Sequence, residues 1–219
     1  MKYVERFMRF FFRQLYHSFA PTYDFVAAIV SFGSWADWVF SILPFIAGTR
    51  ILELGHGPGH LQRILLNRGL FAVGVDESAQ MGTIAKRRLR RSHTVLNAAQ
   101  GKLTRALAQK IPFASESFDS ILSTFPSEYI FDMQTLSEAH RVLRQNGRFV
   151  VLLMAWPKIP LLAWLFKITG QNPSDTHETI KSKIKGSFAA TLFKLDIQIV
   201  EVKSSSLLIV IASKEESTC

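Results

Sequence analysis

A run of glycines preceded by an acidic residue carries the clearest chemical pattern in this sequence. Gly55, Gly57 and Gly59 occupy alternate positions between an apolar stretch and a helical one. Such a turn needs glycine because its backbone angles are unusual and because a ligand lies close to the backbone. Glu53 stands two residues before the first glycine, where its carboxylate can attract the cationic amino group of a ligand. A pyrophosphate would gain nothing from that charge, so the pattern differs from the dinucleotide motif.

A second acidic residue, Asp76, ends the next apolar stretch, 17 residues after Gly59. At the end of a strand, a carboxylate can accept hydrogen bonds from both ribose hydroxyls of an adenosine. Alone, such an aspartate is more often a helix cap or a turn residue, and the glycine run alone could be a structural turn. Their combination at this spacing favours a ligand site.

Alternating strands and helices must position these residues. We expect strands at 50–54, 70–75, 102–107, 118–124 and 148–154, and helices at 60–67, 78–91 and 134–143. Alternation of this kind predicts an α/β fold, with a Rossmann-like, doubly wound and mostly parallel sheet. Two late apolar stretches, 196–203 and 207–213, flank three serines and predict a C-terminal antiparallel hairpin.

The first 48 residues are predicted to form an N-terminal helical cap. Apolar residues recur at three- and four-residue steps over 4–19, while Arg6, Arg9 and Arg13 fall on the opposite side, which predicts an amphipathic helix. Its apolar face either packs on the domain or lies in a membrane interface. The apolar stretch 25–47 is interrupted by glycine, aspartate and proline, so it predicts two helices and a turn rather than a bilayer crossing.

Composition narrows the class of protein. A chain of 219 residues with 48% hydrophobic residues suits one decorated globular domain. Cys219 is its only cysteine, which excludes an internal disulfide or a cysteine-ligated metal cluster and makes a reducing compartment the default. No metal site is predicted, and charges interrupt the region where a signal peptide would be apolar. A cytoplasmic protein is therefore expected.

The net charge of +9 leaves nucleic acid, an anionic membrane and an acidic ligand open as partners. Its densest run, 86–91, falls at the end of an expected helix. Cations there complement the helix dipole, which is the ordinary explanation. Because no RNA-binding motif accompanies the run, nucleic acid is the less favoured partner.

Three further segments, 107–113, 117–122 and 138–148, join these motifs. Together they resemble the class I S-adenosylmethionine (SAM)-dependent methyltransferases over about 49–153. Within that family the likeness is greatest to the small-molecule branch that contains the ubiquinone and menaquinone C-methyltransferases. The segment 19–24 resembles the Tyr-Asp element that caps the cofactor in that branch. The resemblance implies the class I methyltransferase fold and SAM as cofactor.

The resemblance also implies roles for individual residues. The expected cofactor site comprises Tyr23, Glu53, Gly55, His56, Gly57, Gly59, Asp76, Glu77, Ala108, Gln109 and Thr124. Glu53 and the glycine backbone would hold the methionine part, and Asp76 the ribose. Ala108 and Gln109 would meet the adenine edge. The chain departs from the family at Leu107, where many relatives carry an aspartate, and at His56, where small residues are common.

The segment 123–129 follows the fourth expected strand and lies at the sheet edge where acceptors bind. It differs from the Asn-Pro-Pro-aromatic sequence of the nucleic-acid amino-methyltransferases. A general base is needed only if the acceptor must lose a proton. Glu128 and Tyr129 are the base candidates, although either could cap the next helix or pack in the core. His140 lies inside an expected helix and is interpreted as structural.

We expect a SAM-dependent methyltransferase that acts on a small, apolar or lipid-like acceptor. The domain would span 49–219, with an acceptor-side insertion at about 155–190 that is apolar and interrupted by prolines. That insertion could be a lid, a membrane contact or a core helix. The alternatives are an RNA methyltransferase and a SAM-binding, non-catalytic partner protein. Peripheral contact with the inner, anionic membrane face fits the lipid hypothesis; no oligomeric state follows from the sequence.

Overall fold

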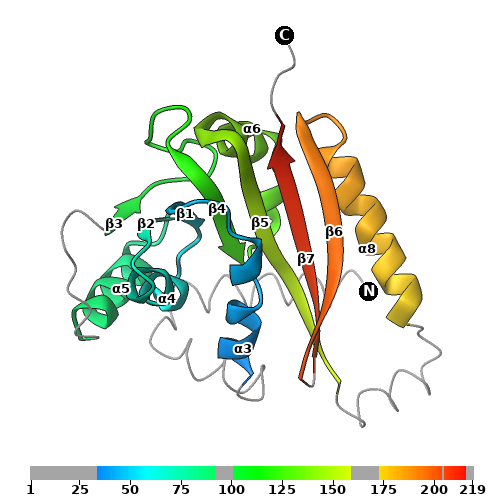
Figure 1. Cartoon of the computed structure of the whole chain (residues 1–219), viewed down its shortest axis with the longest axis horizontal. Helices are drawn as coiled ribbons and strands as arrows, with labels where there is room; N and C mark the ends of the chain where they lie inside the picture. Colours follow the sequence, from blue (N-terminus) through cyan, green and yellow to red (C-terminus); the bar gives the residue numbers. More distant parts are fainter. Residues whose placement is uncertain (1–33, 92–100, 159–172, 204, 216–219) are drawn as a thin grey trace.

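The computed structural model describes residues 34–91, 101–158, 173–203 and 205–215 (Figure 1). The strands are β1 Arg50–Leu54, β2 Phe71–Asp76, β3 Gly101–Arg105, β4 Phe118–Thr124, β5 Leu143–Pro157, β6 Phe193–Val202 and β7 Ser205–Lys214. The helices are α3 Trp35–Phe40, α4 His60–Asn67, α5 Ala79–Arg91, α6 Met133–Val142 and α8 Pro173–Phe188, with 3-10 turns η2 Leu43–Phe45 and η3 Glu128–Phe131. Three features of the sequence analysis lie outside the described residues: the predicted helix over 4–19, Tyr23, and residues 159–172.

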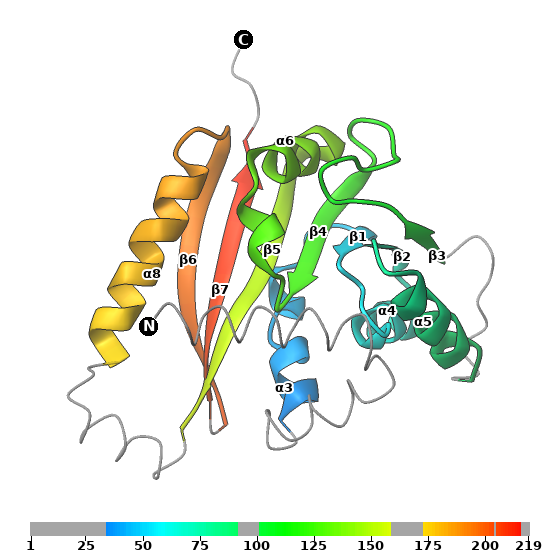
Figure 2. The same ribbon diagram turned by 180° about the vertical axis from the view of Figure 1, so that it is seen from behind.

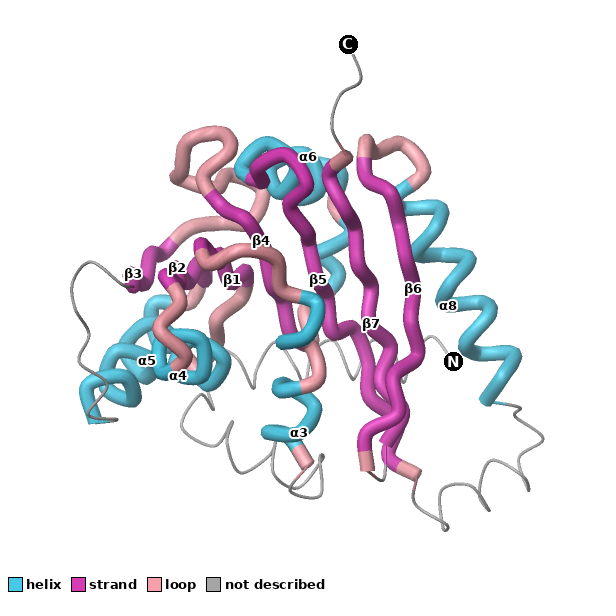
Figure 3. The backbone as a smooth tube through the Cα atoms, in the orientation of Figure 1, coloured by secondary structure: helices cyan, strands magenta, loops and turns pink. Residues whose placement is uncertain are grey.

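The strands form one seven-stranded sheet in the order β3-β2-β1-β4-β5-β7-β6 (Figure 3). The first five pair in parallel, and β7 runs antiparallel to both β5 and β6. This confirms the predicted doubly wound sheet with a terminal hairpin. Because the strand order reverses between β1 and β4, the carboxyl ends of these strands form a switch point where ligands bind in open α/β sheets.

Strands β1, β2 and β4 are buried on both faces, which explains their continuous apolar sequences. On one face, residues of α6 and α8 pack with Leu52, Leu54 and Val73 (Figure 2). On the other, residues of α3 and α4 pack with Ile51 and Ala72. The alternation of neighbouring residues between these two cores fixes the direction of each side chain on β1.

Strand β5 is longer than predicted at both ends. It begins at Leu143, directly after α6, and continues to Pro157. Asn146 lies within the strand as an irregularity, with a φ of 61°. The distal extension has a clear cause, since β7 pairs with β5 from Arg148 to Pro157 and satisfies its backbone groups.

Two other predicted boundaries shift. Strand β3 ends at Arg105, and the chain turns where the Lys110 amide donates to the Leu107 carbonyl at 3.1 Å. In the hairpin, Ser206 was predicted as a turn residue but pairs with Glu201 in register. Its hydroxyl also bonds to the Glu201 carboxylate, at 3.0 and 3.1 Å from the two oxygens. These bonds favour the extended strand over a serine turn.

His140 is packed as a structural residue. Its ring meets Phe193 edge-on, with centroids 5.1 Å apart. Burial, followed by the charge of Lys214, lowers the pKa of His140. The Lys214 ammonium donates to the carbonyls of His140 at 3.2 Å and Leu143 at 2.8 Å. This cation thus caps the carboxyl end of α6 and joins it to β7.

No helix in the described part of the chain is long and apolar enough to cross a membrane.

Candidate functional site

The glycine turn lies at the carboxyl end of β1. Gly55, Gly57 and Gly59 have φ angles of 73°, 51° and 81°, a region that side chains rarely adopt. A Cβ at Gly59 would lie 2.9 Å from the Ala85 Cβ, whereas one at Gly57 would meet nothing within 4 Å. Glycine is therefore required for conformation throughout the turn and for close helix packing at its end. The open space beside Gly57 leaves room for a ligand.

Asp76 joins the glycine turn to the start of α5. Its Oδ2 accepts from the Gly57 amide and its Oδ1 from the Ser78 amide, both at 2.8 Å. Ser78 in turn caps α5, because its hydroxyl accepts from the Met81 amide at 3.3 Å. Each carboxylate oxygen can accept more than one hydrogen bond, so Asp76 retains capacity for ligand hydroxyls.

Glu53 lies beneath this turn and is 1% exposed. Its Oε2 has no hydrogen-bond partner within the described ranges. Burial raises the pKa of Glu53 well above its usual value, the nearby Gln62 side chain opposes that effect, and the charge of Asp76 adds to it. A buried acceptor without a partner costs about 1–3 kcal/mol. A cationic ligand group at Oε2 would remove that cost.

His56 is packed within the turn, 4% exposed. Its Nδ1 lies 2.7 Å from the Gly57 carbonyl, so Nδ1 carries the proton. Burial is the main cause that lowers the pKa of His56, and the Asp76 charge opposes it. A Cβ at Gly74 would approach the His56 side chain to 3.0 Å, so that glycine makes room for the ring. The imidazole thereby holds the turn as a neutral group.

The loop after β3 lies beside Asp76. The Ala106 amide donates to the Asp76 carbonyl at 3.2 Å. Leu107 follows and is 53% exposed, so an apolar surface stands where many relatives were expected to have a carboxylate. The Gln109 amide group donates to the Asp132 carboxylate at 3.3 Å. Ala108 and Gln109 are half-buried in this loop.

Residue Glu77 is exposed directly after β2, next to Asp76. The Arg105 side chain donates to the Glu77 carbonyl at 2.9 Å, which fixes the backbone between β2 and β3. Glu77 therefore lies at the same edge of the sheet as the glycine turn.

An aromatic cluster of Trp35, Trp38 and Phe125 flanks the end of β4. The Phe125 ring centroid lies 4.8 Å from that of Trp35 and 5.9 Å from that of Trp38. Phe125 has a φ of 49°, and its amide donates to the Leu152 carbonyl at 2.7 Å. Thr124 directly precedes it, half-buried at the end of β4. The strained backbone at Phe125 directs the chain from the sheet into this cluster.

The two base candidates lie on η3, in different surroundings. The Tyr129 hydroxyl donates to the Leu54 carbonyl at 3.4 Å and would lie 2.5 Å from a Cβ at Gly55. Tyr129 therefore covers the start of the glycine turn. The Glu128 side chain is exposed.

Three supporting residues were missed by the sequence reasoning. The Arg88 guanidinium donates to the Pro58 carbonyl at 2.5 Å, and the Ser123 hydroxyl donates to the Leu54 carbonyl at 2.8 Å. Gln62 is buried beside Glu53. Of these three, only Arg88 could have been predicted from its sequence position, because it lies one helical turn after Ala85, which packs on the glycine turn.

The site can be compared with known proteins. A family model described as a methyltransferase domain matches residues 52–151. The ubiquinone/menaquinone biosynthesis C-methyltransferase of Geotalea uraniireducens is 30% identical over 161 residues, which cover 70% of this chain and 67% of that protein. The demethylmenaquinone methyltransferase of Thermotoga maritima is 30% identical over 150 residues, 66% of this chain and 62% of its own.

Two solved structures resemble the fold. A putative SAM-dependent methyltransferase from Methanococcus maripaludis has a TM-score of 0.60 at 17% identity, covering 87% of this chain and 91% of its own. The geranyl diphosphate C-methyltransferase from Streptomyces coelicolor has a TM-score of 0.56 at 16% identity, covering 82% and 78%. Fold, glycine turn and acidic residues define a class I methyltransferase. The chain belongs to the class I SAM-dependent methyltransferases, and its cofactor is SAM. Within that family it is similar to the ubiquinone/menaquinone C-methyltransferases, and the RNA and non-catalytic alternatives are not favoured.

Proposed function

We propose that this chain binds SAM across the carboxyl ends of β1, β2 and β3 and methylates a small, apolar, quinone-type acceptor. The observation that carries the cofactor site is the buried Oε2 of Glu53, which has no hydrogen-bond partner among the described residues. The amino group of SAM would supply that partner. The open space beside Gly57 supports a methionine chain at the same place.

The other contacts follow along the sheet edge. Asp76 would accept from the ribose hydroxyls, with Glu77 beside it. Ala108 and Gln109 would border the adenine, and the exposed Leu107 would cover one of its faces instead of binding the amino group. Tyr23 would cap the cofactor from the N-terminal segment.

The bound cofactor supplies an already activated methyl group, so the protein must mainly align the acceptor and exclude water. The aromatic cluster borders Thr124 at the switch point, and offset or edge-on ring contacts suit a flat, unsaturated acceptor. The relatives include demethylmenaquinone methyltransferases, which supports that chemistry. Segments 1–48 and 155–190 would complete the acceptor side of the domain 49–219.

Carbon methylation of a quinol requires that a proton leave the acceptor. The Tyr129 hydroxyl donates to the Leu54 carbonyl at 3.4 Å, which directs its proton toward the backbone, and Glu128 is the carboxylate on the same turn. We therefore propose that Glu128, in preference to Tyr129, accepts the proton that leaves the acceptor.

Transfer of a radiolabelled methyl group tests this proposal. Purified protein is incubated with methyl-labelled SAM and either a short-chain demethylnaphthoquinol or total RNA, and the organic and aqueous phases are counted. We expect label in the organic phase. Label only in the RNA, or none in the quinol despite bound cofactor, would refute the acceptor class.

The predicted helix over 4–19 would bring the protein to an anionic membrane surface, where a lipid-soluble acceptor resides. Its support is the sequence pattern of aromatic residues opposite Arg6, Arg9 and Arg13. The protein should sediment with anionic vesicles, and less so at high salt, because salt screens the basic charge. Phe7→Glu with Phe11→Glu should abolish sedimentation. A sharply lower melting temperature instead would mean that this face packs on the domain.

A further inference from the structure

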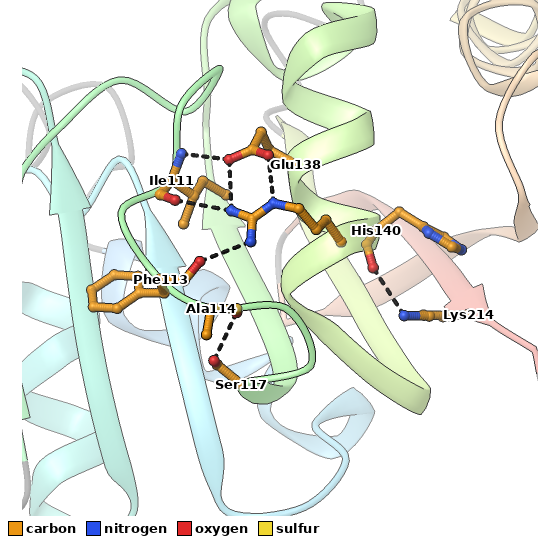
Figure 4. A network of polar contacts seen from close by, with 8 residues as sticks. Ile111, Phe113, Ala114, Ser117, Glu138, His140 and Lys214 are labelled. Atoms are coloured by element: carbon orange, nitrogen blue, oxygen red, sulfur yellow. Dashed lines mark hydrogen bonds and ion pairs between the residues drawn. The ribbon is translucent and has the colours of Figure 1, made fainter.

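Two side chains of α6 hold the loop between β3 and β4 (Figure 4). The Glu138 Oε2 accepts from the Ile111 amide at 2.8 Å. Arg141 donates to the Phe113 carbonyl at 2.8 Å and to the Ile111 carbonyl at 3.0 Å. Glu138 and Arg141 also bond to each other through two contacts, at 2.6 and 2.9 Å. One ion pair therefore satisfies three backbone groups of a segment that belongs to no strand.

The geometry of this pair is specific. Ile111 is 3% exposed, and buried backbone groups outside regular structure need partners. The hydrogen bond from Arg141 lowers the pKa of Glu138, and Glu138 raises the pKa of Arg141, so both stay charged. A planar guanidinium that bonds two carbonyls and a carboxylate fixes direction as well as distance.

The held segment adjoins the cofactor side of the sheet. At its start, the Ala106 amide is bonded to the Asp76 carbonyl at 3.2 Å. At its middle, Gln109 reaches Asp132, which caps α6 by accepting from the Gln134 amide at 2.9 Å. The chain from 107 to 110 is thus held by hydrogen bonds to β2 on one side and to the start of α6 on the other. A nucleoside whose ribose lies on Asp76 would place its base against this stretch.

We propose that Glu138 and Arg141 are positioning residues for nucleobase recognition. They act through the loop and touch no part of the cofactor. This inference rests on the proposed location of the cofactor, and it assigns the selectivity for adenine to a loop conformation that α6 imposes. Because these bonds hold the backbone at Ile111 and Phe113, loss of the bidentate contact would let residues 107–110 shift relative to Asp76.

Arg141→Lys tests the inference, since lysine keeps the charge but loses the planar fork. The readout is the ratio of dissociation constants for S-adenosylhomocysteine and S-inosylhomocysteine, measured by calorimetry. These ligands differ only in the base. We expect S-adenosylhomocysteine to bind about tenfold more weakly and the selectivity ratio to fall by a similar factor, because a 1 Å displacement of positioned groups already has large effects.

Arg144→Lys is the matched control. Arg144 lies three residues further on and donates to the Glu116 carbonyl at 3.1 Å and to the Asp119 carboxylate at 2.8 Å. These contacts join the start of β5 to Glu116 and to the amino end of β4, at the edge of the sheet opposite the glycine turn. The control should lower the melting temperature without changing the selectivity ratio.

Glu138→Gln provides a second variant if Arg141→Lys fails to fold. The glutamine carbonyl can still accept from Ile111, so a smaller loss of selectivity is expected. An unchanged ratio in folded Arg141→Lys or Glu138→Gln overturns the positioning role, even if the protein is less stable. Failure of the wild-type protein to bind S-adenosylhomocysteine would instead overturn the proposed cofactor site, so the two failures are distinguishable.

Discussion

The replacement Glu53→Gln should separate the binding role of this residue from its effect on folding. The change keeps the shape of the side chain and removes its ability to ionise. Glu53 is 1% exposed, and its Oε2 has no hydrogen-bond partner in the described part of the chain. If that oxygen serves the amino group of the cofactor, the variant should bind S-adenosylhomocysteine more weakly and yet fold at least as well.

The expected loss of affinity follows from the type of contact. A hydrogen bond to a charged group contributes about 1.5–3 kcal/mol. Since about 1.4 kcal/mol corresponds to a tenfold change, the dissociation constant should rise roughly 10- to 150-fold. Affinity of the wild type should increase with pH as Glu53 ionises, whereas the variant should lack this dependence.

The stability effect has the opposite sign. Burial raises the pKa of Glu53 well above its ordinary value, so the folded state holds this proton at pH values where the unfolded state has released it. The stability that this group contributes is therefore present below the unfolded pKa and is lost as pH rises through the folded pKa. The glutamine does not titrate. The melting temperature of the variant should therefore increase relative to that of the wild type as pH rises.

Calorimetry with S-adenosylhomocysteine and thermal unfolding from pH 5 to pH 8 measure the two effects. Glu201→Gln is the control, because the Glu201 carboxylate pairs with Lys158 on the surface at 2.6 Å. It should leave binding unchanged. A Glu53→Gln protein that is less stable at high pH but binds with wild-type affinity would refute the reasoning.

The remaining predictions concern three other site residues. Asp76→Asn should weaken binding of S-adenosylhomocysteine by about 1.5–3 kcal/mol, the range for a charged hydrogen bond, with a small change in melting temperature because its amide oxygen keeps one backbone contact. Unchanged affinity in calorimetry would remove Asp76 from the site. Leu107→Asp should tighten binding by about 0.5–1.5 kcal/mol by offering an acceptor to the adenine amino group, and weaker binding would contradict that placement. Tyr129→Phe should retain kcat within about threefold, since its hydroxyl faces the Leu54 carbonyl; a drop of about 100-fold or more would identify Tyr129 as the base.

The sequence predicted the local backbone conformation of the candidate site. The three glycines have the unusual backbone angles inferred for them, and Asp76 ends β2 as expected. Both features depend on neighbouring residues and on the known geometry of a strand-to-helix turn. The parallel order of the strands follows likewise from the alternation of strands and helices.

Contacts between distant segments could not be predicted in this way. Glu138 meets Ile111 across 27 positions, and Arg88 meets Pro58 across 30. The length of β5 also depends on β7, which pairs with it far along the chain. In each case tertiary packing determines which residue or strand is the partner, so residue types and local spacing cannot predict it.

Calorimetric titration of the wild-type protein tests the proposed SAM site at Glu53, the glycine turn and Asp76 most directly. S-adenosylhomocysteine should bind with a micromolar dissociation constant, about −8 kcal/mol, and NAD should not bind. Tighter binding of NAD than of S-adenosylhomocysteine would contradict the account.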